Sequence, residues 1–97
     1  MTILSSKLAD WGDGDLVYYC LGCDSAHMLT TTRRNNVGAR WTWDGNADAP
    51  TFSPSVHLPG VCHHFLRAGR LQYLGDSRHA LAGQTVELPD LPDWMQD

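Results

Sequence analysis

The stretch "CHHFLRAGRLQYLG", residues 62–75, predicts two antiparallel strands joined by a tight turn. Ala68 and Gly69 form a two-residue loop in which both positions need positive φ if the turn is type I′. The register that follows from this turn forms three cross-strand pairs: Leu66 with Leu71, Phe65 with Gln72, and His64 with Tyr73. Alternation then places one set of side chains on a common face: Cys62, His64, Leu66, Leu71 and Tyr73. His63 and Phe65 face the other way.

Other segments also carry strand signals, and helix signals are almost absent. Residues 15–20, "DLVYYC", are β-branched and aromatic, and residues 39–44 alternate so that Trp41 and Trp43 share a face. Residues 49–60, "APTFSPSVHLPG", carry three prolines, which confine them to an edge strand or an extended loop. A short strand followed by a Pro-Asp tail ends the chain. The sequence therefore predicts a mainly β, small single-domain antiparallel fold with little helix.

Length and composition agree with one domain. The chain has 97 residues, of which 42% are hydrophobic and 19% charged, as in ordinary globular proteins. We expect a lead-in over residues 1–14, a zinc-stapled β core over residues 15–88 and an acidic tail over residues 89–97. No basic segment followed by a long apolar one opens the chain, and the apolar runs are short. We therefore expect a cytoplasmic protein with no membrane partner.

The net negative charge comes from the C-terminal part of the chain. The net charge is −4, and no basic residue follows Arg78, whereas four acids do: Glu87, Asp90, Asp93 and Asp97. The rest of the chain is balanced. General nucleic-acid binding is not expected, because affinity for phosphate backbones comes from clustered Lys and Arg.

The pair of cysteines in "CLGC", residues 20–23, has the usual spacing of a zinc knuckle. The same spacing occurs at thioredoxin-like redox sites, but those lie where a strand enters a helix, and no helix is predicted here. Three buried, inert thiols are a further alternative. The third cysteine, Cys62, stands beside His63, with His79 following the hairpin. Three cysteines and one histidine are a common closed zinc set.

The order and spacing of five segments resemble a family of small phage and prophage proteins of unknown function, whose members are sometimes labelled ammonia monooxygenase. The segments are "CLGC", "WTWDG", "PTFSPS", "CHHF…GRLQYLGD" and "HALAGQTVELP", and the resemblance covers about residues 17–90. It implies roles for six residues: Cys20, Cys23, His27, Cys62, His63 and His79. His64 stands where a smaller polar residue is expected, which argues against it as a ligand. A thiolate-rich site suits zinc better than the copper chemistry of ammonia oxidation.

Six candidates compete for four positions on the zinc. The three cysteines come first, because thiolates hold zinc strongly. For the fourth ligand we prefer His79, which follows the hairpin closely enough to return to Cys62. His63 is the alternative, although alternation turns it away, and His27 is expected near the metal without binding it.

Two functions of different class follow from these residues. In the first, the protein has no catalytic residue and zinc stabilises the fold. Trp41, Trp43 and Phe52 then form a surface that binds a host or phage protein. A defence or regulatory protein in the cytoplasm of a host cell is an example of such a partner. In the second the protein is a zinc-dependent hydrolase, in which His27 or His63 carries the proton beside an open metal position. The sequence lacks His-Glu-x-x-His, so we prefer the binding module. The sequence indicates no oligomeric state.

Overall fold

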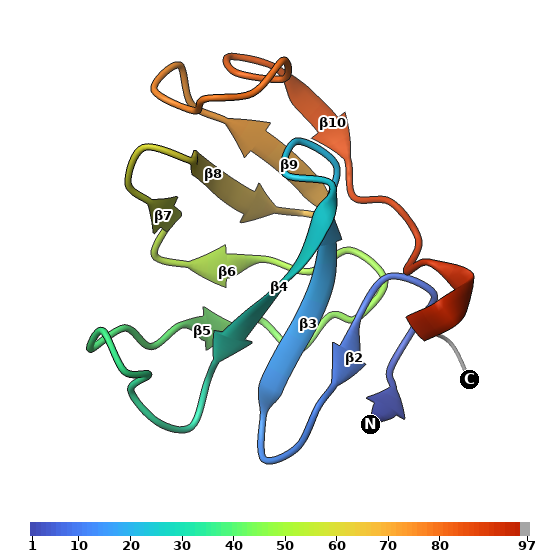
Figure 1. Ribbon diagram of the computed structural model, residues 1–97. Helices are drawn as coiled ribbons and strands as arrows, with labels where there is room; N and C mark the ends of the chain where they lie inside the picture. Colours follow the sequence, from blue (N-terminus) through green and yellow to red (C-terminus); the bar gives the residue numbers. More distant parts are fainter. Residues whose placement is uncertain (96–97) are drawn as a thin grey trace.

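Ten short strands and one 3₁₀ helix make up residues 1–95, the part of the chain that this computed structural model describes (Figure 1). One four-stranded sheet has the order β1 (Thr2–Ile3), β2 (Ala9–Asp10), β3 (Asp15–Cys20), β4 (Ser25–Thr30). The other has the order β10 (Thr85–Glu87), β9 (Arg70–Tyr73), β8 (Cys62–Arg67), β7 (Val56–Leu58). A separate pair contains β5 (Thr42–Trp43) and β6 (Phe52–Ser53). All the strand pairs are antiparallel, which confirms the predicted fold class.

The β8–β9 hairpin has the predicted register. His64 pairs with Tyr73, Phe65 with Gln72 and Leu66 with Leu71. Both turn residues have positive φ, 49° at Ala68 and 73° at Gly69. The side chains that were predicted to share a face are at most 1% exposed at every position, and they comprise Cys62, His64, Leu66, Leu71 and Tyr73. This face brings the third cysteine into the core that the two larger sheets share.

One strand within the proline-rich residues 49–60 lies at a sheet edge, which was one of the two predicted placements. β7 pairs only with β8 in the sheet order, so its other side is not covered by a strand of this sheet. His57 of β7 lies directly opposite His63 of β8 in the register. This pairing matters below, because it sets two imidazole rings side by side.

Both ends of the chain contribute more structure than the sequence predicted. Within the expected lead-in, β1 and β2 extend the first sheet, and Leu8 and Ala9 are fully buried. At the other end, Leu91 and Met95 pack with Ala9 and Val17 in a small second core. Figure 1 shows the 3₁₀ helix η1 (Asp93–Met95) near β2. The end of the expected acidic tail, residues 96–97, lies outside the described residues.

The aromatic side chains that were expected to form a binding surface lie mainly in the core. Trp41 is 8% exposed and Phe52 2% exposed. Trp43 is partly buried and stacks on Phe52, with ring centroids 6.4 Å apart. The short β5–β6 pair packs on the core of both sheets and so carries these rings inward. Within residues 1–95, no helix is long and apolar enough to cross a membrane.

Candidate functional site

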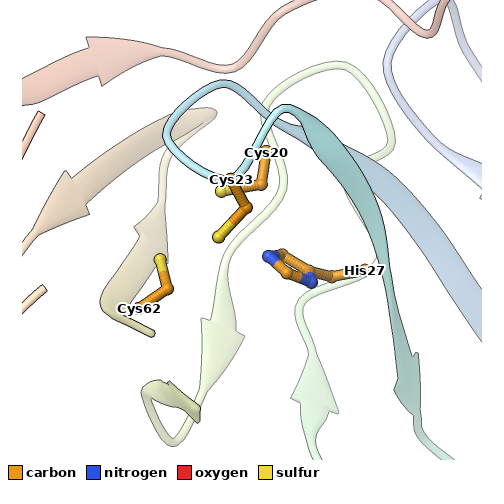
Figure 2. A group of neighbouring side chains, drawn as sticks. All are labelled: Cys20, Cys23, His27 and Cys62. Atoms are coloured by element: carbon orange, nitrogen blue, oxygen red, sulfur yellow. The ribbon is translucent and has the colours of Figure 1, made fainter. Parts of the chain in front are cut away.

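Four side chains, three from residues 20–27 and one from the start of β8, converge on one point (Figure 2). Cys20 ends β3, Cys23 lies in the turn before β4, His27 lies within β4, and Cys62 begins β8. One ligand atom of each lies within 4.8 Å of the corresponding atoms of the other three. Figure 2 shows the thiols of the β3–β4 turn and the His27 ring directed toward the space beside Cys62. The set can hold a metal ion, and we refer to it as the metal cluster.

The histidine that completes this set is His27, whereas the sequence analysis preferred His79. The His27 Nε2 atom is buried and has no hydrogen-bond partner, which leaves its lone pair free for a metal. His79 Nε2 lies 3.2 Å from the Cys62 sulfur, but His79 Nδ1 accepts a hydrogen bond from the Leu81 N–H. A neutral imidazole that accepts at Nδ1 carries its hydrogen on Nε2. His79 is therefore arranged to donate to Cys62 rather than to bind a metal beside it.

The turn of the knuckle needs glycine because of His79. A Cβ atom on Gly22 would overlap the His79 ring. The Gly22 N–H also donates to the Tyr73 hydroxyl, 3.0 Å away. The absence of a side chain thus lets His79 cover the cluster while the turn is tied to β9.

In the absence of a cation, burial and mutual repulsion oppose the ionisation of all three thiols of the cluster together. Burial raises the pKa of Cys20, but interactions with His27, Tyr73 and the backbone outweigh this and lower it to about 6. Burial raises the pKa of Cys62, and the neighbouring Cys20 raises it further. Burial also raises the pKa of Cys23. A divalent metal removes this conflict, because it binds the deprotonated forms and offsets their repulsion.

Buried polar side chains surround the thiols. The Cys62 sulfur lies 3.2 Å from His64 Nδ1, and His64 Nε2 lies 2.7 Å from the Tyr18 hydroxyl. The Cys20 sulfur lies 3.2 Å from the Tyr73 hydroxyl. Burial, together with the nearby histidines, lowers the pKa of His64 to about 3, so this ring is neutral. His64 is therefore a fully buried hydrogen-bonding partner of the cluster, a role that the sequence analysis missed.

A second group of side chains lies on the other face of β8. Ser55, which immediately precedes β7, places its Oγ 3.2 Å from His63 Nε2. The other ring nitrogen, Nδ1, lies 3.1 Å and 3.2 Å from the two carboxylate oxygens of Asp76, in the loop after β9. Ser55, His63 and Asp76 thus form a continuous chain of hydrogen bonds. We refer to them as the triad.

The direction of these hydrogen bonds follows from Asp76. A carboxylate only accepts, so His63 Nδ1 carries the hydrogen, and Nε2 is free to accept from the Ser55 hydroxyl. The hydrogen bond from His63 lowers the pKa of Asp76, although burial acts weakly against it. This is the arrangement that activates a serine hydroxyl as a nucleophile in acyl transfer.

The backbone around His63 is held in place on both sides. Its N–H donates to the Ser77 hydroxyl, and that hydroxyl donates back to its carbonyl oxygen. Leu74 N–H also donates to the same carbonyl. Across the site, the Ser55 carbonyl accepts a hydrogen bond from the buried Trp41 indole. The nucleophile and the base are therefore carried by restrained segments.

A cavity of about 400 Å³ opens beside the serine, between the edge strands β4 and β7. Its lining is mostly apolar and includes Leu29, Trp41, Pro54, Ser55 and Val56. A nucleophile at the rim of such a cavity is where a bound substrate would present the bond to be broken.

Of the three residues of the triad, only His63 was predicted from the sequence as a site residue. His63 was considered as a zinc ligand and as a proton carrier, and the structure turns it away from the cysteines toward Ser55. Ser55 lies in the quoted stretch "PTFSPS" and Asp76 in "YLGD", but neither was singled out. The order of the residues along the sequence does not predict such a triad, because unrelated folds contain it in different orders.

Comparison with protein families adds a description to this geometry. A family model described as bacterial ubiquitination-like system serine protease (BubE) matches residues 3–74. The chain belongs to the BubE family. The BubE match includes all four residues of the metal cluster together with Ser55 and His63, and it ends shortly before Asp76. Neither a curated protein nor a solved structure shows significant similarity to the chain. The phage origin expected from the sequence stays a prediction.

Proposed function

We propose that the chain is a serine protease in which Ser55 is the nucleophile, His63 the general base and Asp76 the residue that orients His63. The observation that carries this proposal is the pair of contacts on the His63 ring, 3.2 Å to Ser55 Oγ and 3.1 Å to the Asp76 carboxylate. The description of the BubE family supports it independently.

The geometry supports the following steps. Ser55 Oγ attacks the scissile carbonyl carbon while His63 Nε2 takes the hydroxyl proton, and Asp76 stabilises the imidazolium that forms. His63 then returns the proton to the departing amine, which leaves an acyl group on Ser55. Water, deprotonated by His63, attacks the acyl carbon and releases the acid and the free serine. The hydrolase alternative of the sequence analysis named His63 as proton carrier, and we retain that role beside a serine instead of a zinc-bound water.

In this account the metal has a structural task. Three thiolates and one imidazole suit zinc, and four protein ligands leave it no open position for water. Zinc bound by Cys20, Cys23, His27 and Cys62 would join the β3–β4 turn to the start of β8. His63 follows Cys62 directly, so the metal would also fix the strand that carries the general base.

The substrate class follows from the site and the family together. The apolar cavity beside Ser55 is bordered by two edge strands, which can accommodate an extended peptide chain. We propose that the protein partner expected from the sequence is a substrate. The description of the family places its members in a bacterial ubiquitination-like system, and we propose that the substrate is a protein of the same system.

A peptide-cleavage assay tests this function. The zinc-loaded protein is incubated with a library of fluorogenic peptides, and Ser55→Ala is compared with Ser53→Ala, which changes the exposed serine of β6 in the same stretch. We expect Ser53→Ala to cleave like the wild type and Ser55→Ala to fall by at least about 10³-fold. Equal cleavage by both variants would refute the assignment.

A further inference from the structure

The proposed mechanism leaves one side chain beside the triad unused. His57 lies opposite His63 in the β7–β8 register, and their rings stack with centroids 4.2 Å apart and planes 29° apart. His57 Nε2 also lies 3.9 Å from the Asp76 carboxylate. One potential metal-binding atom from each of His57, His63 and Asp76 lies within 4.8 Å of those of the other two.

The chemistry of these three groups suits a divalent metal. Imidazole nitrogen and carboxylate oxygen are zinc ligands, and three protein ligands plus water are a common zinc arrangement. The Asp76 carboxylate places a negative charge beside the two rings, which favours a dication. The site is also accessible, because the side chains of His57 and Asp76 are 50% and 58% exposed. A metal can therefore enter from solvent without any opening of the fold.

We infer that His57, His63 and Asp76 form a second, inhibitory zinc site, which switches off Ser55 by taking the general base and its aspartate as ligands. The metal site itself rests on geometry, whereas the inhibition rests on the proposed function. The metal cluster is a separate site, since Cys62 lies on the opposite face of β8 from the His63 side chain, and the other ligands of the cluster come from β3, β4 and the turn between them.

The inhibition follows from which nitrogen of the His63 ring carries the hydrogen. In the triad, Nδ1 carries the hydrogen and Nε2 accepts from Ser55. A metal on Nδ1 needs that lone pair, so the hydrogen leaves Nδ1 and a solvent proton occupies Nε2, with no net change in ring protonation. Nε2 then cannot take the proton of Ser55. Metal binding and serine activation exclude each other at the same ring.

The two sites should differ widely in affinity. Three thiolates and a buried imidazole form the metal cluster, whereas the second site offers two imidazoles and one exposed carboxylate. The first equivalent of zinc therefore fills the cluster and leaves the serine active. A second equivalent, bound more weakly, inhibits.

The experiment measures zinc content and serine reactivity on the same samples. Protein containing one equivalent of zinc is equilibrated with buffered free zinc; bound metal is measured by mass spectrometry, and Ser55 reactivity by its rate of labelling with a fluorophosphonate. We expect a second equivalent to bind while the labelling rate falls at least about tenfold. A weak chelator that spares the first zinc should restore the rate.

His57→Gln and Asp48→Asn make the comparison specific. His57→Gln removes a ligand, and we expect it to raise the zinc concentration for half-inhibition by about 10- to 100-fold, measured against its own rate with only the first zinc bound. Asp48→Asn removes an exposed carboxylate outside the triad and should behave like the wild type. The inference fails if no second equivalent binds, if His57→Gln binds and is inhibited like the wild type, or if the second zinc leaves labelling unchanged. Should Ser55 never label, the proposed function fails, and metal content alone still decides whether the site exists.

Discussion

Asp76→Asn tests the triad with the smallest change of shape. An asparagine keeps the size of the side chain but removes the charge, and its amide can donate to His63 Nδ1. That contact favours the tautomer with hydrogen on Nε2, which cannot accept from Ser55. In a triad with a buried aspartate, this change costs about 10⁴-fold in rate. The Asp76 side chain is 58% exposed, so water can partly replace it as the acceptor. We therefore expect a smaller loss, about 10²- to 10³-fold, or about 2.7–4 kcal/mol of barrier.

The assay is the rate of fluorophosphonate labelling at saturating structural zinc, with a weak chelator present to keep the second site empty. Asp48→Asn serves as the matched control, and melting temperature and zinc content are measured on both variants. We expect both variants to fold and to keep one zinc, with only Asp76→Asn losing reactivity. A wild-type labelling rate in a folded Asp76→Asn would refute the role of the carboxylate.

Three further predictions concern the metal cluster. Cys20→Ser should lose the metal and unfold, because structural zinc contributes on the order of 10 kcal/mol in small domains, comparable with the whole stability of such a domain; metal analysis and thermal melting check this, and a metal-free variant with wild-type stability would contradict it. His27→Ala should reduce zinc affinity far more than His79→Ala, measured by competition with a chromophoric chelator, and the reverse order would restore His79 as the ligand. Gly22→Ala should displace the His79 ring and lower the stability by about 1–3 kcal/mol, measured by denaturant unfolding; an unchanged midpoint would show that the ring can move freely.

The hairpin could be predicted in detail because local rules decide it. Alternation and a two-residue turn at Ala68-Gly69 determine the register, and the register determines the face. The same reasoning brought Cys62 into the core. The edge position of β7 followed from the prolines of its segment, since proline cannot complete the hydrogen bonds of a central strand.

The burial of the aromatic rings and the choice of the histidine ligand depend on contacts between segments that are far apart in the sequence. The burial of Trp41 and Phe52 comes from the packing of the β5–β6 pair on the larger sheets, which no local pattern reports. The choice between His27 and His79 depends on a hydrogen bond from the Leu81 N–H, which sets the tautomer of His79. The positions of the histidines in the sequence do not predict this hydrogen bond.

The triad was hidden for a related reason. Alternation correctly turned His63 away from the cysteines, but it could not say what His63 faces. The answer comes from the loops before β7 and after β9, which bring Ser55 and Asp76 to opposite nitrogens of one ring. Neither loop has a sequence pattern that predicts a nucleophile.

The most direct test of the central claim is to locate a fluorophosphonate adduct by mass spectrometry of the digested, zinc-loaded protein. The account predicts one adduct, on Ser55, whose formation is abolished by His63→Ala and unaffected by Ser53→Ala. No adduct on Ser55, or labelling of Ser55 at the same rate after loss of His63, would contradict it.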